Sequence, residues 1–177
     1  MIEAVGEGID KVYASVNYTL AAGQEVEKLV AHAGSTGLTL TGNTLDNSLY
    51  GRAGQDTLIG GDGADRLIGD TDADTFIFQA LSQSTVASTG RDTIVDFSQV
   101  DADKIDVSLI DANSGASADQ AFVFISAAAF SGVAGELRSE ATTTNTIVWG
   151  DVNGDAVADF AVTVQGVISL HTSDFIL

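Results

Sequence analysis

The chain has 177 residues and carries 25 acidic against 7 basic residues, a formal net charge of −18 at pH 7. This balance excludes nucleic acid as a natural partner and disfavours anionic membranes, because both require a basic surface. The sequence has no cysteine and no proline, and 45% of its residues are hydrophobic, too many for an ordinary disordered chain. These values fit a foldable chain that is held open by its own charge until cations neutralise it.

The length suits one domain, or two small ones that share a core. No run of about 18 apolar residues is present, so we expect no membrane insertion. Residues 1–10 contain acids and no base, which indicates that no N-terminal signal peptide is present.

The first 41 residues are predicted to lead into a regular core. Residues 11–20 alternate between apolar and polar side chains, which predicts one half-buried strand with Val12 and Val16 facing the same way. Residues 23–41 resemble degenerate coils that cap the core, with inward-facing Leu29, Leu38 and Leu40.

Residues 42–77 form four blocks of nine: GNTLDNSLY, GRAGQDTLI, GGDGADRLI and GDTDADTFI. Each block opens with glycine and has Asn or Asp sixth and a large apolar residue eighth, the pattern of calcium-binding parallel β-helix repeats. The alternative is a flexible Gly/Asp-rich linker. A linker needs no apolar residue at every ninth position, whereas five occur in register: Leu40, Leu49, Leu58, Leu67 and Phe76.

Two blocks make one coil of a flattened roll, so turns on the same edge are 18 residues apart. Asn47 is therefore predicted to lie over Asp65, and Asp56 over Asp74. Stacked carboxylates repel one another, and a hard divalent cation removes that repulsion. Calcium accepts about 6 to 8 oxygens from carboxylates and backbone carbonyls, which makes Ca²⁺ the expected cofactor.

The second half of the chain is predicted to cap the roll. Residues 79–91 form a polar loop, and the strands at 92–97 and 103–109 turn Asp92, Asp96 and Asp103 back toward the roll. Further strands are expected at 121–125, 135–140, 145–150 and 157–164, with an exposed loop at 111–120. Short strands separated by turn signals indicate a β-sandwich-like cap.

Residues 151–159, DVNGDAVAD, resemble a calcium-binding loop with Asp151, Asn153, Asp155 and Asp159 as oxygen ligands. The loop lacks the twelfth-position Glu of an EF-hand, and Ala156 replaces the usual glycine. A polar β-turn is the alternative.

Nothing in the sequence predicts an enzyme. It contains no HExxH zinc motif, no cysteine nucleophile and no GxSxG motif. Asp62 and Asp65 could imitate a glycosidase pair, but the repeat already explains them as turn residues. Tyr13, Tyr50 and Trp149 could stack on sugars or simply pack against neighbouring side chains.

Together these motifs resemble two known families. Blocks 51–77 resemble the RTX (repeats-in-toxin) β-roll. The segments DTIVDF, DKIDVS, AGELR, GDVNGDAVADF and SDFIL, in this order, are similar to the C-terminal domain of serralysin-type secreted proteins. The resemblance implies an all-β fold, a short parallel β-roll capped by an antiparallel β-sandwich-like region. It implies leading coils at 1–41, the roll at 42–77 and the cap at 78–177.

The resemblance also implies calcium ligands from pairs of turns. One site takes oxygens from Asn43, Leu45 and Asn47 with Gly60, Asp62 and Asp65. A second takes them from Arg52, Gly54 and Asp56 with Gly69, Thr71 and Asp74. A third joins Gly61, Gly63 and Asp65 to Asp92 or Asp96.

The first and last blocks depart from the family pattern. Leu45 replaces a glycine and Asn47 replaces an aspartate, so the first site carries less charge and is expected to be weaker. Asp70 and Asp72 occupy glycine positions in the last block and are expected to strain its turn.

The resemblance implies a non-catalytic calcium-binding module that folds outside the cell and serves as a type I secretion unit. The final residues, Asp174 to Leu177, resemble the end of a type I export signal. The implied partners are the secretion apparatus and a covalently linked passenger domain, and the implied location is secreted, extracellular or at the cell surface. The alternative is a polysaccharide-binding or adhesion module attached to a partner enzyme.

Overall fold

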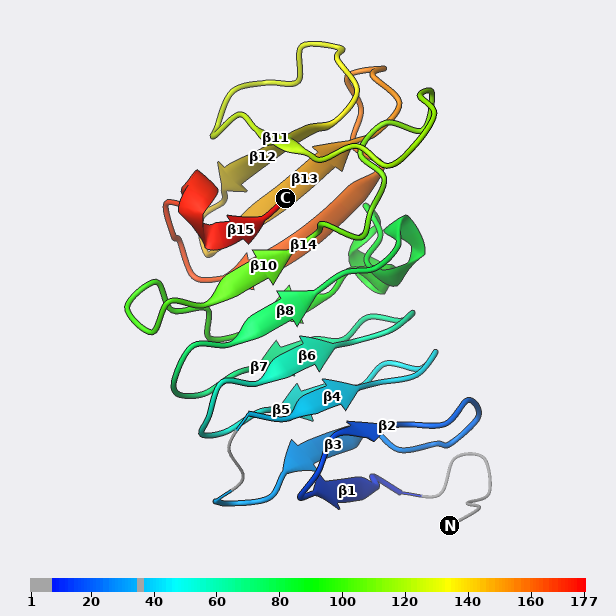
Figure 1. The fold of residues 1–177 in the computed structure, drawn as a ribbon, viewed down its shortest axis with the longest axis vertical. Helices are drawn as coiled ribbons and strands as arrows, with labels where there is room; N and C mark the ends of the chain where they lie inside the picture. Colours follow the sequence, from blue (N-terminus) through cyan, green and yellow to red (C-terminus); the bar gives the residue numbers. More distant parts are fainter. Residues whose placement is uncertain (1–7, 35–36) are drawn as a thin grey trace.

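The computed structural model describes residues 8–34 and 37–177, which form two long β-sheets facing each other around an apolar interior (Figure 1). In spatial order, sheet A contains β1 (Lys11–Ala14), β3 (Lys28–Ala31), β5 (Ser48–Tyr50), β7 (Arg66–Ile68), β9 (Thr93–Ile94), β14 (Phe160–Gln165), β13 (Asn145–Asp151), β12 (Glu136–Ala141) and β11 (Val123–Phe124). Sheet B contains β15 (Phe175–Ile176), β10 (Lys104–Asp106), β8 (Thr75–Ile77), β6 (Thr57–Ile59), β4 (Thr39–Thr41) and β2 (Tyr18–Thr19). The three helical segments are single 3-10 turns at Leu81–Gln83, Ser88–Gly90 and Thr172–Asp174.

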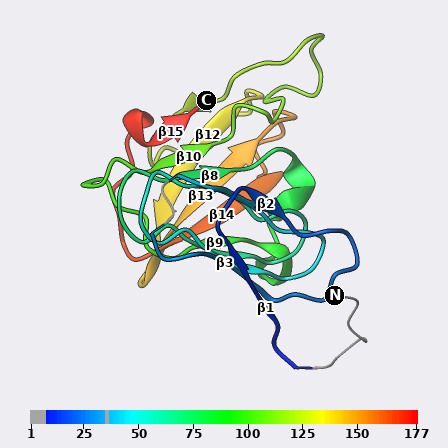
Figure 2. The same ribbon diagram turned by 60° about the horizontal axis from the view of Figure 1, so that its bottom comes forward.

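From β1 to β10, successive strands alternate between the two sheets, so this part of the chain winds as a flattened coil. Within each sheet of the roll, neighbouring strands are parallel and pair in the 18-residue register that the repeats predict, as in Leu40 with Leu58 and Leu49 with Leu67. Figure 2 shows the successive coils overlapping when the bottom of the molecule is brought forward. The all-β parallel roll is confirmed.

The core is a double row of side chains from the eighth position of each block. Leu40, Leu58 and Phe76 line sheet B, while Leu49 and Leu67 line sheet A, and all five side chains are fully buried. The three-residue strands present one such residue inward and its neighbours outward, because successive side chains of a strand point to opposite faces. The predicted register and core residues are confirmed.

The roll extends beyond the four clear blocks at both ends. At its N-terminal end, β1 and β3 continue sheet A and β2 and β4 continue sheet B. The prediction of one strand over 11–20 is wrong. The chain bends at 15–17, so that β1 and β2 lie in opposite sheets, and Val16 is 66% exposed.

The C-terminal cap continues the same two sheets. Sheet A passes from parallel to antiparallel where β14 pairs with β9 on one side and β13 on the other, and β12 follows β13. Sheet B ends with β15, which lies parallel to β10. The expected antiparallel C-terminal region is therefore present. The domain boundaries at 42 and 78 stay a prediction, since both sheets run across them. Among the described residues, no helix is long and apolar enough to cross a membrane.

Candidate metal centre

The turns of the roll stack in two columns, one along each long edge. We call the column that contains turns 42–47 and 60–65 and the segment 78–92 the first edge. The column that contains turns 51–56 and 69–74 and the segment 95–103 is the second edge. The sixth residue of each block lies where its turn enters the next strand, so its side chain is carried to the same place in every coil.

Each edge holds a ladder in which a buried side chain accepts a hydrogen bond from the coil before it. On the first edge, Oδ1 of Asp65 accepts the Asn47 N–H at 2.7 Å, and Oδ1 of Asp92 accepts the Asp65 N–H at 2.8 Å. Asn47 and Asp65 are thus stacked as predicted. The Asp92 N–H donates to the Ser84 hydroxyl, and that hydroxyl donates to the Ala161 carbonyl, which ties the ladder to the cap.

The second edge repeats this arrangement. Oδ1 of Asp56 accepts the Leu38 N–H at 2.5 Å, Oδ1 of Asp74 accepts the Asp56 N–H at 2.8 Å, and Oδ1 of Asp103 accepts the Asp74 N–H at 2.9 Å. The other oxygen of Asp103 accepts the Ser98 N–H. The predicted stacking of Asp56 over Asp74 is confirmed, and Asp103 closes the column.

Four of these carboxylates have one oxygen without a partner. The Oδ2 atoms of Asp56, Asp65, Asp74 and Asp92 are buried and accept no hydrogen bond. The four residues are at most 2% exposed. A buried carboxylate oxygen without a donor costs free energy, and it marks a place for a bound cation or water.

The opening glycines make room for these unpaired oxygens. A Cβ atom at Gly60 would collide with Oδ2 of Asp65, and one at Gly69 would collide with Oδ2 of Asp74. A side chain at the first position of the block would therefore displace the carboxylate at the sixth.

Burial raises the pKa of these carboxyl groups, because a charged group loses its hydration in the interior. The pKa rises to about 7 for Asp65 and for Asp74, with burial as the main cause and neighbouring acids as a further one. For Asp92 burial raises the pKa to about 9, and the charge of Asp65 adds to the effect. The pKa of Asp56 and that of Asp103 are also raised by burial. Without a bound cation, the folded protein therefore disfavours the charged form of these buried aspartates.

The turns also present backbone oxygens. In the two middle blocks, the second and fourth residues have positive φ angles. These are Arg52 (72°) and Gly54 (113°) in the block that begins at 51, and Gly61 (100°) and Gly63 (124°) in the block that begins at 60. Carbonyls of turn 42–47 face turn 60–65 closely, since a Cβ at Gly61 would collide with the Asn43 oxygen. In the other column, the Arg52 carbonyl faces Thr71, from which it accepts the N–H at 2.8 Å and the side-chain hydroxyl at 3.5 Å.

The oxygens available in the turns suit calcium better than they suit a metal that is bound by side chains alone. Within the described residues, no group of three or more His, Asp or Glu side chains is placed to hold a metal. Calcium takes carbonyl and carboxylate oxygens together, and the unpaired Oδ2 atoms lie beside glycine-rich turns that expose carbonyls. The first two predicted ligand sets come from facing turns, although their roles as ligands stay a prediction.

The two alternative acids of the third predicted set lie on different edges. Asp92 lies on the first edge with Asp65. Asp96 lies on the second edge, where its carboxylate accepts the N–H groups of Gly69 and Asp70. Asp92 is therefore the alternative on the same edge as Gly61, Gly63 and Asp65, and its role as a ligand stays a prediction.

The two end blocks differ from the others, as their sequences indicate. Asn43 and Leu45 lack the positive φ angles of the other blocks, while Asp70 (68°) and Asp72 (77°) adopt them. The latter conformation is strained for residues other than glycine, although Asp tolerates it better than most.

The loop 151–159 forms a hairpin turn closed by its own polar groups. The Asp151 carboxylate accepts N–H groups from Asn153, Gly154 and Ala156 at 3.2, 2.7 and 3.0 Å. Asp159 accepts the Val152 N–H and the Asn153 side-chain amide. The acids of this loop already have donors, in contrast to those of the roll. Calcium binding by Asp151, Asn153, Asp155 and Asp159 stays a prediction.

Comparison with known families gives a match over nearly the whole chain: the family model for "Peptidase M10 serralysin C terminal" matches residues 17–177. The chain belongs to the serralysin C-terminal family. Comparison with curated protein sequences found no significant match.

Solved structures with the same fold include two subunits of the Azotobacter vinelandii mannuronan C5-epimerase. The AlgE6R2 subunit is 22% identical with a TM-score of 0.56, and the match covers 97% of this chain and 94% of that one. The AlgE6R3 subunit is 23% identical with a TM-score of 0.52, covering 97% and 80%. At these identities the likeness concerns the fold. The RTX-type β-roll of the serralysin C-terminal family is in general a calcium-binding fold, in agreement with the unpaired oxygens described above.

The sequence predicts that Asp103 turns back toward the roll, but it does not predict that Asp103 is the last member of the second ladder or that Ser84 has a role in the first. Asp103 closes the second edge, and Ser84 anchors Asp92 to the cap. The signal for Asp103 is present in the sequence, because DKID at 103–106 repeats the acid-polar-apolar order of DTLI at 56–59 and DTIV at 92–95. Ser84 lies in an irregular loop, and no pattern indicates its role.

Proposed function

We propose that this chain is a non-catalytic, calcium-dependent folding module that serves as the type I secretion unit of an exported protein. The observation that carries the proposal is the set of buried, unpaired carboxylate oxygens of Asp56, Asp65, Asp74 and Asp92. Such a set is unfavourable in a folded chain without cations, and it becomes favourable when a cation completes it.

The residues that would hold calcium are the stacked turns of the two edges. Asp56 and Asp74 would contribute carboxylates on the second edge, and Asp65 and Asp92 on the first. Bound calcium supplies the positive charge that these acids lack and links oxygens from successive coils. Because the sites do not exist in the unfolded chain, binding free energy becomes folding free energy.

The same residues make the module sensitive to its compartment. In a calcium-poor cytosol the net charge of −18 and the unneutralised carboxylates favour the unfolded, exportable chain. Extracellular modules bind calcium at about 10⁻⁴ to 10⁻³ M, so folding would follow export. A passenger domain linked to the chain would then be retained outside, in the medium or at the cell surface.

The C-terminal residues fit this order of events. Asp174 and Phe175 are buried, and the ring centroids of Phe175 and Phe124 are 4.7 Å apart. An export signal in these residues is accessible only before the cap has formed, so recognition by a secretion apparatus has to precede folding.

A calcium titration followed by far-UV circular dichroism tests the proposal. The protein starts in chelator, and magnesium serves as the control ion. A cooperative transition from coil to β structure with calcium alone is expected. A spectrum that is already β-rich in chelator and unchanged by calcium would refute the folding switch.

A polysaccharide-binding or adhesion module attached to a partner enzyme is the second candidate. It is favoured by the two structures of the same fold, which are subunits of an epimerase named for a polysaccharide, mannuronan. Retardation in native gels cast with acidic or neutral polysaccharides plus calcium would support this candidate.

A further inference from the structure

The outer face of sheet A is basic in a strongly acidic protein. Of the 7 Lys and Arg residues, Lys11, Lys28 and Arg66 occupy one outward-facing row of β1, β3 and β7, together with Ser48 of β5. The next outward row contains Tyr13, Val30, Tyr50 and Ile68. Neither row contains an acid, although acids outnumber bases 25 to 7 in the chain.

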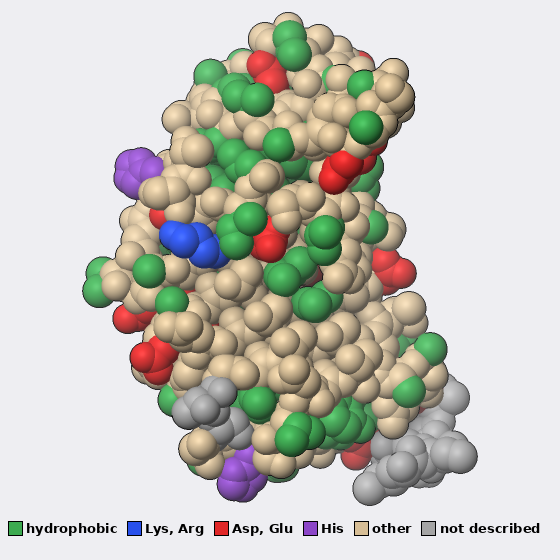
Figure 3. All heavy atoms as spheres, viewed as in Figure 1, with side chains coloured by type: hydrophobic (Ala, Val, Ile, Leu, Met, Phe, Trp, Pro, Cys, Tyr) green, Lys and Arg blue, Asp and Glu red, His purple; other side chains and the backbone are tan. Residues whose placement is uncertain are grey.

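The opposite face of the roll has no such character. The corresponding row of sheet B consists of Thr39, Thr57 and Thr75, and only at β10 does Lys104 follow. Figure 3 views the molecule from this side, and blue side chains are confined to one small area of it. Four of the seven basic residues are thus on strands of sheet A (Lys11, Lys28, Arg66 and Arg138), and one is on a strand of sheet B (Lys104).

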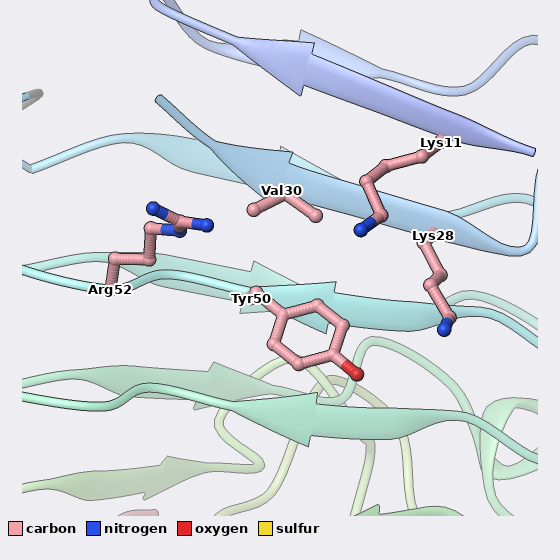
Figure 4. A pocket seen from close by; sticks show the side chains of 5 residues that line it. All are labelled: Lys11, Lys28, Val30, Tyr50 and Arg52. Atoms are coloured by element: carbon pink, nitrogen blue, oxygen red, sulfur yellow. The ribbon is translucent and has the colours of Figure 1, made fainter. Parts of the chain in front are cut away.

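A shallow groove runs across this basic face. Its walls are Lys11, Lys28, Tyr50 and Arg52, with Val30 between them (Figure 4). We call this set the basic groove. It adjoins a second hollow lined by Tyr13 and His32, and Arg52 lies in the walls of both. A third hollow, which shares Tyr50 and Arg52 with the groove, is lined by Asp70 on its far side.

The cations of this face have no acidic partner in the described part of the chain, where the one ion pair joins Arg138 to Glu140 at 3.3 Å. Lys11 instead lies over the Tyr13 ring, with its Nζ atom 5.6 Å from the centroid, and Tyr13 is 58% exposed. Cations without an acidic partner, beside the exposed Tyr13 and the half-buried Tyr50, form a surface that can bind an anion with a flat, partly apolar body.

The spacing of the cations selects among polyanions. Parallel strands are about 4.8 Å apart. Lys11 and Lys28 are on adjacent strands, and Arg66 is two strands beyond Lys28, so the charges of the row are separated by intervals comparable with one or two sugar rings. Duplex DNA carries one charge per about 1.7 Å, a density that a few cations on an acidic protein do not match. A polymer of uronic acids carries one carboxylate per ring, and its rings can pack against tyrosine.

We propose that the basic groove, together with Tyr13 and Arg66 beside it on the same face, binds a carboxylated polysaccharide, with Lys11, Lys28, Arg52 and Arg66 pairing with uronate groups and Tyr13 and Tyr50 packing against the sugar rings. This inference specifies the ligand class and the surface of the second candidate function. It depends on the folded roll and not on export.

The test is a binding titration of the calcium-folded protein with fluorescently labelled oligoglucuronate, compared with a neutral cello-oligosaccharide of equal length. The variant combines Lys11→Gln, Lys28→Gln and Arg66→Gln, all at outward strand positions. Arg52 is left unchanged because its carbonyl belongs to a proposed calcium site. An exposed ion pair is worth up to about fivefold in affinity, so the triple variant should bind on the order of tenfold more weakly.

The matched control combines Ser117→Glu, Ala127→Glu and Thr143→Glu, which lower the net charge equally at exposed loop positions of the cap. It should bind nearly as well as the wild type. Equal loss in control and variant would mean that only the total charge matters, and unchanged binding in the variant would mean that the groove is not the site. Both results overturn the proposal.

Further measurements distinguish a carboxylated polysaccharide from other ligands, and failure of the groove from failure of the folding hypothesis. Equal affinity for the neutral oligosaccharide, or tighter binding to a single-stranded DNA oligomer or to phosphatidylserine vesicles, would contradict the ligand class. Circular dichroism in the same buffers reports folding independently. A chain that is β-rich in chelator would refute the calcium switch and still allow the groove to be tested there.

Discussion

At the scale of single residues, two asparagines end the ladder of acids on the first edge. The Asn43 side-chain amide donates to the carbonyls of Ala21 and Gln24 at 3.2 and 2.8 Å, and that of Asn47 donates to the Val26 carbonyl at 2.8 Å. A carboxylate has no proton to donate in this way. The asparagines therefore join the roll to its leading coil by hydrogen bonds at the point where the stack of acids stops.

The aspartates further along should be sensitive to truncation. We expect Asp56→Ala and Asp74→Ala each to raise the calcium midpoint of folding by about tenfold or more, because each removes a carboxylate from a proposed site. The measurement is the calcium titration by circular dichroism. Asp119→Ala removes the same charge from an exposed loop and should leave the midpoint unchanged. Unchanged midpoints in all three variants would refute the assignment of the second edge.

The raised pKa values predict that protons can replace calcium in part. Asp65 and Asp74 have pKa values of about 7 in the folded chain and Asp92 of about 9, against about 3.9 for an unperturbed Asp. The folded state therefore binds more protons than the unfolded state between pH 4 and 9. The contribution of these groups to the free energy of unfolding is therefore fully present below about pH 4 and is lost as the pH rises through 7 to 9.

In chelator, lowering the pH from 8 to 5 should thus increase β structure and resistance to urea. Circular dichroism at each pH measures this effect. Stability in chelator that instead increases toward pH 8 would show that these acids are not buried in the calcium-free fold.

At the scale of elements, the turns require glycine for space as well as for conformation. Gly61 (φ 100°) and Gly23 (φ 76°) both adopt positive φ, but a Cβ at Gly61 would meet the Asn43 carbonyl and one at Gly23 would meet nothing within 4 Å. We expect Gly23→Ala to cost about 1 kcal/mol from backbone strain. Gly61→Ala should cost about 2 to 4 kcal/mol, because overpacking adds to the strain.

Urea unfolding in saturating calcium measures the difference between these two variants. Equal costs would mean that the stacked turns can separate without loss, in which case the close contact of turns 42–47 and 60–65 is not needed for stability.

Periodicity predicts the elements of the roll well, and it fails where the chain turns a corner. The apolar residues from Leu40 to Phe76 recur every nine positions, and their sheets and partners follow from that spacing alone. Residues 11–20 alternate without a break, so no signal indicates that 15–17 bend. The side chain of Val16 matches the alternation as well as those of its neighbours do, although it lies outside the core.

The basic face could not be predicted from the sequence for a related reason. Lys11, Lys28 and Arg66 are separated by 17 and 38 residues, and the register that joins Lys28 through Ser48 to Arg66 combines intervals of 20 and 18. The leading coils differ in length from the regular ones. Only the folded register brings these cations into one row. The ladders, by contrast, follow from the constant interval between Asp56 and Asp74.

At the scale of the whole molecule, charge and fold predict a large change in size. A folded chain of 177 residues has an expected radius of gyration of about 16 Å, and the unfolded chain about 45 Å. We expect small-angle X-ray scattering to report a decrease toward the smaller value as calcium is added in place of chelator. Sodium chloride at equal ionic strength should produce a much smaller contraction, since screening weakens repulsion without bridging the coils. Equal contraction by both salts would argue against specific sites.

In both ladders, the hydrogen bonds between backbone N–H groups and carboxylates run from an earlier coil to a later one. The N–H groups of Leu38, Asp56 and Asp74 each donate to a carboxylate that comes later in the sequence, ending at Asp103. The acceptors that complete an early coil are thus synthesised after its donors. A ribosome makes the chain from its N-terminus, so the turns of the early coils are synthesised before the carboxylates that accept their N–H groups. Backbone bonds such as that from the Thr57 N–H to the Leu38 carbonyl can already join these coils, but the ladders are complete only after Asp92 and Asp103 have been made.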